Sequence, residues 1–154
     1  MEERYKSKIV VDLLLERLNE ETNKKEILLS LRQNTGNGDG LYDLPGGHVD
    51  ANEDLIEAMI REAKEEICID IRREDVKIIH IYHHYEKDLI KFVFSTKKYS
   101  NELRNGEPDK CKELKWFGYD NLPENIIPKV KEEIENIKKN VYYNSDNKIS
   151  YFLD

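Results

Sequence analysis

Cysteine is scarce in this chain, and long apolar runs are missing. The two cysteines, Cys68 and Cys111, offer no disulfide framework and favour a reducing compartment. No apolar run of signal-peptide type lies near the N-terminus, and no segment approaches the length of a membrane span. We therefore expect a cytoplasmic protein that does not insert into a membrane.

Positive charge is also in deficit. The chain has 25 lysine and arginine residues against 32 aspartate and glutamate residues, which gives a formal net charge of -7. This balance argues against a nucleic-acid duplex as the main partner, although scattered basic patches are compatible with phosphate binding. The length predicts that residues 1–154 form a single domain with a substantial core. The sequence is compatible with a homodimer.

Negative charge is concentrated on one predicted helix, at about residues 52–67. Glu62, Glu65 and Glu66 share one arc of this helix beside its apolar face. Like charges at this spacing repel one another, and the single guanidinium of Arg61 does not balance them. The arc therefore predicts a cation site, and its oxygen ligands suit Mg²⁺ or Mn²⁺. A solvated acidic face is the alternative. The apolar face comprises Leu55, Met59, Ile60, Ala63 and Ile67.

The segment from Gly47 to Ile69 resembles the Nudix box. That pattern is Gly-x5-Glu-x7-Arg-Glu-(aliphatic)-x-Glu-Glu-x-Gly-(aliphatic). Ala63 fills the aliphatic position with a small residue, and Cys68 replaces the final glycine. A glycine there usually supplies a left-handed helix cap, so the departure concerns the loop after the helix and not the acids. The matching positions are Gly47, Glu53, Arg61, Glu62, Glu65, Glu66 and Ile69.

The resemblance implies the α/β class, as a Nudix-type α/β/α sandwich with a mixed central sheet. It also implies a hydrolase that uses Mg²⁺ (or Mn²⁺) to cleave a diphosphate linkage, with Glu65 or Glu66 as the catalytic base. Glu53 and Arg61 are expected to form a salt bridge that supports the site. The expected metal ligands are the carbonyl of Gly46 and the carboxylates of Glu62, Glu65 and Glu66.

A second resemblance covers residues 105–111, which are followed by Trp116 and Phe117. It matches the Asn-x-Glu-Pro-x-Lys-Cys segment of a Nudix subgroup that includes nucleotide-pool sanitising enzymes. Either Glu107 or Glu113 is then expected to bring a further carboxylate to the metal site, and Lys110 to meet a phosphate. A turn with flanking charges is the alternative interpretation.

Other residues are candidates for further substrate contacts. His48 follows the glycines and is a candidate to meet a phosphate, and Arg32 is a further candidate. Tyr82, Phe92 and Phe94 are suited to stacking on a base, but strands favour aromatic residues for packing alone. Three more histidines are interpreted as half-buried or edge residues rather than zinc ligands. They are His80, His83 and His84.

Hydrophobic patterns predict the remaining elements. The loop at residues 33–40 is either a lid or a surface loop, and the tail at residues 140–154 either covers a pocket or is loosely attached. Asp50 or Asn52 is expected to cap the first helix, and a second helix is expected at residues 129–139. Strands are expected at residues 8–15, 26–31, 76–85, 89–96 and 114–117, the first two as a hairpin around residues 19–25.

These observations favour an enzyme that acts on a small nucleotide substrate. The first expectation is a (deoxy)nucleoside triphosphate pyrophosphohydrolase, and an ADP-ribose or sugar-nucleotide pyrophosphatase is the nearest rival. A catalytically silent nucleotide-binding module is the alternative of a different class. The intact carboxylates of Glu62, Glu65 and Glu66 favour the enzyme, since a silent module has no need to hold repelling charges together.

Overall fold

The computed structural model describes residues 2–146 and 151–152 of the chain. Within these residues, α1 comprises Leu55–Ile67 and α2 comprises Pro128–Lys138, with short 3-10 turns at Arg73–Asp75 and Tyr85–Lys87. The strands are β1 Lys8–Asn19, β2 Lys24–Arg32, β3 Tyr42–Asp43, β4 Gly46–His48, β5 Val76–His84, β6 Leu89–Thr96, β7 Cys111–Gly118, β8 Val141–Ser145 and β9 Tyr151–Phe152.

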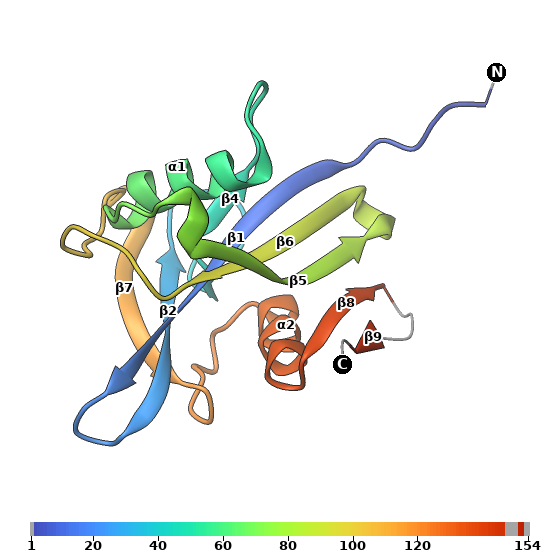
Figure 1. Ribbon diagram of the computed structural model, residues 1–154. Helices are drawn as coiled ribbons and strands as arrows, with labels where there is room; N and C mark the ends of the chain where they lie inside the picture. Colours follow the sequence, from blue (N-terminus) through green and yellow to red (C-terminus); the bar gives the residue numbers. More distant parts are fainter. Residues whose placement is uncertain (1, 147–150, 153–154) are drawn as a thin grey trace.

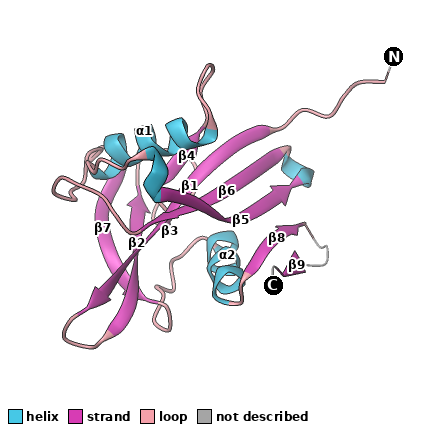
Figure 2. Cartoon of the chain, in the orientation of Figure 1, coloured by secondary structure: helices cyan, strands magenta, loops and turns pink. Residues whose placement is uncertain are grey.

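The strands form one mixed sheet in the order β3-β2-β1-β6-β5-β8-β9, with β4 paired to β1 and β7 paired to β2. Strands β1 and β6 are parallel, as are β5 and β8, whereas β1–β2 and β5–β6 are antiparallel. Helix α1 lies on one side of the sheet and α2 on the other (Figures 1 and 2). The predicted α/β/α arrangement with a mixed sheet is therefore confirmed.

Strand β1 supplies side chains to both faces of this sheet. Val11, Leu13 and Leu15 are fully buried in a cluster with the apolar residues of α1, whereas Leu14 packs with Val130 and other residues on the α2 face. This alternation follows from the two-residue period of a strand. Because β1 is central and covered on both sides, it fixes the positions of the two helices relative to each other.

The predicted hairpin is present but longer than expected. Strands β1 and β2 remain paired out to Asn19 and Lys24, so the turn is confined to residues 20–23. Polar side chains accompany this extension, including an ion pair between Arg17 and Glu26 at 2.7 Å. The apolar pattern ends earlier because the outer part of the hairpin has exposed side chains, while its backbone ladder continues.

Helix α1 begins later than the sequence analysis expected. Its N-cap is Asp54, whose carboxylate accepts hydrogen bonds from the backbone N–H groups of Ile56 and Glu57, both at 2.9 Å. The side chain of Glu57 in turn accepts from the Asp54 N–H at 2.7 Å, which completes a capping box. The prediction of Asp50 or Asn52 as the cap was wrong, since Asn52 has a φ of 67° and lies in the preceding turn.

Helix α1 ends at Ile67, and its C-cap is Cys68. This cysteine adopts the left-handed conformation that a glycine would favour. Its φ is 61° and its ψ is 20°. A side chain with a Cβ is strained in this region, whereas glycine is not. The cysteine that stands where the Nudix pattern has glycine therefore keeps the cap geometry, but its backbone is locally strained.

We expect the variant Cys68→Gly to be more stable than the parent chain by about 1 kcal/mol, because it relieves this left-handed strain. Urea unfolding at neutral pH measures the difference. Cys68→Ala is the matched control, since it removes the thiol and keeps the Cβ. If both variants show the same stability, the backbone conformation is not the cause.

The tail is attached to the sheet as far as the structure describes it. Strand β8 pairs in parallel with β5, and the ring of His80 contacts both the carbonyl of Val141 at 2.8 Å and Oδ1 of Asn144 at 2.7 Å. Loose attachment is therefore wrong for residues 141–146, while residues 147–150 and 153–154 lie outside the described residues. None of the described helices is long and apolar enough to cross a membrane.

Candidate active site

Arg61 lies at the centre of the charged cluster on α1. Its guanidinium donates to both carboxylate oxygens of Glu53, with Nη2–Oε1 at 2.6 Å and Nε–Oε2 at 3.0 Å. Its Nη1 also donates to Oε1 of Glu62 at 2.8 Å and to Oε2 of Glu65 at 3.3 Å. The predicted salt bridge between Glu53 and Arg61 is confirmed, and the same guanidinium orients two of the three clustered acids.

Glu53 connects this cluster to the loop before the helix. Its Oε1 accepts a hydrogen bond from the backbone N–H of Asp50 at 2.7 Å. The hydrogen bonds from Arg61 and from that N–H hold the pKa of Glu53 below its usual value. Nη2 of Arg61 donates to the carbonyl of His48 at 3.1 Å. Helix α1, the loop and the end of β4 are thereby fixed relative to one another.

Glu66 is half-buried against the glycine turn on the other side of the cluster. Its Oε2 accepts a hydrogen bond from the backbone N–H of Gly46 at 2.8 Å. Burial raises the pKa of Glu66 to about 8, although the Gly46 N–H opposes this shift. The neighbouring Gly47 is required for space, because a Cβ there would lie 2.4 Å from Oε1 of Glu62. The glycine turn thus contacts two of the predicted metal ligands.

These acids fit a hard divalent cation in donor type and in charge. Glu62 is half-buried, and burial raises the pKa of its carboxyl, as do Glu65 and Glu107, while Arg61 lowers it. Across residues 2–146 and 151–152, no three His, Cys, Asp or Glu side chains converge closely enough to hold a metal ion. In this structure Glu62 and Glu65 instead contact Arg61. A cation held by all three acids therefore requires their side chains to come closer together, and Glu65 is 49% exposed.

The loop at residues 105–111 packs on the C-terminal end of α1. The backbone N–H of Gly106 donates to the carbonyl of Glu66 at 2.9 Å, and that of Arg104 donates to the carbonyl of Ile67 at 3.2 Å. A Cβ at Gly106 would lie 2.1 Å from the carbonyl oxygen of Glu65, so this approach requires glycine. The loop satisfies carbonyls that a helix end leaves without partners.

The same loop decides between the two further carboxylates. Glu107 is close enough to raise the pKa of both Glu62 and Glu66. The carboxylate of Glu113 instead accepts a hydrogen bond from the hydroxyl of Tyr42. Lys110 is exposed, with its Nζ 3.7 Å from Glu107 Oε1. Glu107 is therefore the carboxylate that the fold brings to the cluster.

Arg32 and His48 have different environments. The guanidinium of Arg32 donates to the carbonyl of Asn37 at 2.8 Å and to Oδ2 of Asp43 at 3.1 Å, so it braces the loop at residues 33–40. That loop is also held from within by the carboxylate of Asp39, which accepts backbone N–H groups at 3.0 Å. His48 is exposed beside the glycine turn. A phosphate contact by either residue stays a prediction.

The aromatic and histidine candidates on the sheet are mainly packing residues. Phe94 is fully buried and Phe92 packs against the same core on the α1 face. Tyr82 is buried with its hydroxyl donating to Asp146, and His84 contacts the same carboxylate at 2.6 Å. The interpretation of these residues as structural is supported.

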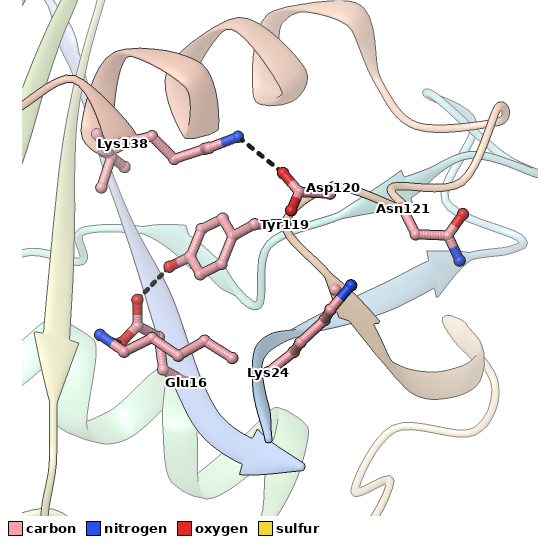
Figure 3. Close-up of a pocket in the computed structure, with 9 residues that line it drawn as sticks. Glu16, Lys24, Tyr119, Asp120, Asn121 and Lys138 are labelled. Carbon is pink, nitrogen blue, oxygen red and sulfur yellow. Dashed lines mark hydrogen bonds and ion pairs between the residues drawn. The ribbon is translucent and has the colours of Figure 1, made fainter. Parts of the chain in front are cut away.

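A cleft of about 510 Å³ lies away from the acidic cluster, between the outer part of the β1–β2 hairpin and the C-terminal end of α2 (Figure 3). Across it, the hydroxyl of Tyr119 donates to Glu16, and Lys138 pairs with Asp120 at 3.6 Å. No candidate site residue lines this cleft. Its lining residues are Glu16, Lys24, Lys25, Gly118, Tyr119, Asp120, Asn121, Ile137 and Lys138.

The burial of Glu66 predicts that the metal-free protein is most stable under mildly acidic conditions. Burial raises the pKa of Glu66 to about 8. The folded chain therefore keeps a proton that the unfolded chain releases, so its stabilising contribution is lost as the pH rises from about 5 to 8. We expect a higher urea midpoint at about pH 6 than at about pH 8.5. A midpoint that rises over this interval contradicts the assignment.

Comparison with known proteins agrees with this geometry. The family model described as the NUDIX domain matches residues 10–141. The chain is 32% identical over 119 residues to an ADP-ribose pyrophosphatase of Methanocaldococcus jannaschii, an alignment that covers 75% of this chain and 64% of that relative. The chain thus spans less than two thirds of the length of this curated relative.

Solved structures show the same fold. A MutT NUDIX hydrolase from Burkholderia pseudomallei superposes with a TM-score of 0.72 at 26% identity, over 84% of this chain and 97% of that one. A NUDIX hydrolase from Nitrosomonas europaea superposes with a TM-score of 0.70 at 19% identity, over 93% of this chain and 79% of that one. Because the family model spans the glycine turn, the acidic cluster of α1 and both helices, the chain belongs to the NUDIX domain family.

Proposed function

We propose that this protein is a pyrophosphohydrolase that uses Mg²⁺ or Mn²⁺ to cleave the diphosphate linkage of a nucleoside diphosphate derivative. The observation that carries the proposal is the half-buried carboxylate of Glu66, which accepts a hydrogen bond from the Gly46 N–H at 2.8 Å and is flanked by Glu62 and Glu107. Carboxylates grouped beside a glycine turn suit the binding of a cation, and the cation in turn attracts a phosphate.

Glu62, Glu65 and Glu66, with the carbonyl of Gly46, would hold the cation, whose positive charge neutralises the diphosphate of the substrate. The other roles belong to the chain itself. Arg61 holds Glu62 and Glu65 in place and is anchored by Glu53. Glu66, which the Gly46 N–H holds at 2.8 Å, is proposed to take a proton from the attacking water. Glu65 is the alternative base, and it is the more exposed of the two.

The substrate class that we propose first is a (deoxy)nucleoside triphosphate. The second candidate is ADP-ribose or a sugar nucleotide, which the similarity to an ADP-ribose pyrophosphatase favours. In either case His48 and Lys110 are proposed to meet phosphates, because both are exposed near the acidic cluster. Arg32 is proposed to contact the substrate beside the loop at residues 33–40, which it braces.

A panel of nucleotides tests the proposal. Canonical and oxidised deoxynucleoside triphosphates, ADP-ribose and dinucleotide polyphosphates are incubated with Mg²⁺ or with Mn²⁺, and phosphate and pyrophosphate release are measured. We expect turnover of at least one class that stops when EDTA removes the metal. Nucleotide binding without release of phosphate or pyrophosphate from any compound would identify a silent binding module instead.

A further inference from the structure

Three charged side chains are buried together beneath α2, outside the acidic cluster of α1. The ammonium of Lys91 on β6 lies 3.0 Å from Oδ2 of Asp12 on β1 and 3.1 Å from Oε1 of Glu133 on α2. Asp12 is 5% exposed and Glu133 is 2% exposed. Lys91 pairs with both carboxylates, and among the described residues these two oxygens have no hydrogen-bond partner of good geometry.

Such a cluster is costly to bury, so its retention calls for a role. Removing ions from water carries a penalty of several kcal/mol per ion, and well-packed apolar residues often replace buried ion pairs without loss of stability. Two carboxylates also share a single ammonium here. Burial lowers the pKa of Lys91, but Asp12 and Glu133 outweigh this effect and hold it above its usual range, so Lys91 is charged.

Asp12 extends from this cluster to the glycine turn of the candidate site. In the antiparallel pairing of β1 with β4, Asp12 stands opposite Gly46. A Cβ at Gly46 would lie 2.4 Å from Oδ1 of Asp12, so this carboxylate packs directly against the Gly46 backbone. The N–H of that same residue donates to Glu66 at 2.8 Å. The backbone of Gly46 therefore lies between Asp12 of the buried cluster and Glu66, the proposed base.

We propose that Lys91 is a positioning residue, which holds Asp12 against Gly46 and thereby keeps the Gly46 N–H aimed at Glu66. Glu133 holds Lys91 from the opposite side and connects the arrangement to α2. This inference rests on the proposed function for its effect on turnover. Its structural part, the link from Lys91 to the Gly46 N–H, is independent of the substrate.

Amide hydrogen exchange in the variant Lys91→Met tests the structural part. Methionine keeps the length of the side chain and removes the charge, so Asp12 loses the group that fixes it. We expect exchange of the Gly46 amide to accelerate about 10-fold or more, as local opening becomes easier. The amide of Val49, which donates to the carbonyl of Ile9 at 3.0 Å, should keep its parent rate. Unchanged protection of Gly46 in the folded variant overturns the proposal.

Turnover of ADP-ribose and of a deoxynucleoside triphosphate, each with Mg²⁺, tests the functional part. We expect kcat to fall about 10- to 100-fold with KM changed less than about 2-fold, as for groups that orient an active-site residue. Lys138→Met is the control, because Lys138 on α2 pairs with Asp120 away from the acidic cluster. A parent chain that hydrolyses neither compound contradicts the proposed function alone, since the exchange measurement still stands.

A second variant keeps the test decisive if Lys91→Met does not fold. Asp12→Asn preserves the shape of the side chain and removes its ion pair with Lys91. We expect the same acceleration of Gly46 exchange and the same loss of kcat. Parent-like exchange and kcat in folded Asp12→Asn would show that the cluster only stabilises the fold and would overturn the positioning role.

Discussion

The variant Glu66→Gln should lose about 10²- to 10⁴-fold in kcat, the range typical of a lost general base. Glutamine keeps the size of the side chain, and its carbonyl oxygen still accepts the Gly46 N–H. It does not take a proton, and it removes a negative charge from the proposed cation site. Steady-state turnover with Mg²⁺ of the compound that the nucleotide panel identifies measures the effect.

The fold should survive this change. Because burial raises the pKa of Glu66 to about 8, ionised Glu66 opposes folding at alkaline pH, and a neutral glutamine relieves that cost. We therefore expect the unfolding midpoint of Glu66→Gln at about pH 8.5 to equal or exceed that of the parent. Glu132→Gln is the control, since Glu132 pairs with Lys129 on the exposed side of α2. Near-parent turnover of Glu66→Gln defeats the assignment of Glu66.

The variant Arg61→Met should be the most strongly destabilised single change in the candidate site. Arg61 is 27% exposed and contacts four carboxylates, those of Asp50, Glu53, Glu62 and Glu65. Methionine leaves these charges facing one another without a cation. We expect a loss of about 2–3 kcal/mol in the free energy of unfolding, as for a partly buried ion pair that loses one partner. Thermal unfolding without metal should show a Tm lower by about 5–10 °C.

The control for this prediction is Arg17→Met. Arg17 is 47% exposed, contacts the single carboxylate of Glu26 at 2.7 Å, and lies over the ring of Trp116. Exposed ion pairs of this kind contribute about 0–1 kcal/mol. Equal Tm shifts in the two variants would show that the number of carboxylates around Arg61 carries no special cost. Added Mg²⁺ should recover part of the Arg61→Met loss, since the acids then regain a cation.

Local patterns were informative where a residue's role depends on its near neighbours in the chain. Glu53 and Arg61 are eight residues apart on adjoining loop and helix, and the resemblance of this segment to the Nudix box implied the ion pair that the structure contains. The helical arc of Glu62, Glu65 and Glu66 follows from the 3.6-residue period. Three residues that can accept hydrogen bonds, Asp50, Asn52 and Asp54, precede α1. The start of the helix was misplaced because the path of the backbone makes Asp54 the N-cap.

Long-range packing decided what these patterns left open. The choice of Glu107 over Glu113 depends on how the loop at residues 105–111 packs on the end of α1, a contact between segments about 40 residues apart. The attachment of β8 depends on its parallel pairing with β5, which carries no local signal in an aromatic and polar segment.

The sequence by itself determined the acidic arc, because the arc arises from helical periodicity within one short segment. The resemblance of that segment to the Nudix box implied the supporting salt bridge and the layered α/β class. Only the tertiary structure placed Asp12, Lys91 and Glu133 together and put the carboxylate of Asp12 against Gly46. Those three residues stand on β1, β6 and α2, and in the sequence each is an ordinary charged residue. These residues are buried, and their electrostatic interactions are strengthened, only when α2 packs against the sheet.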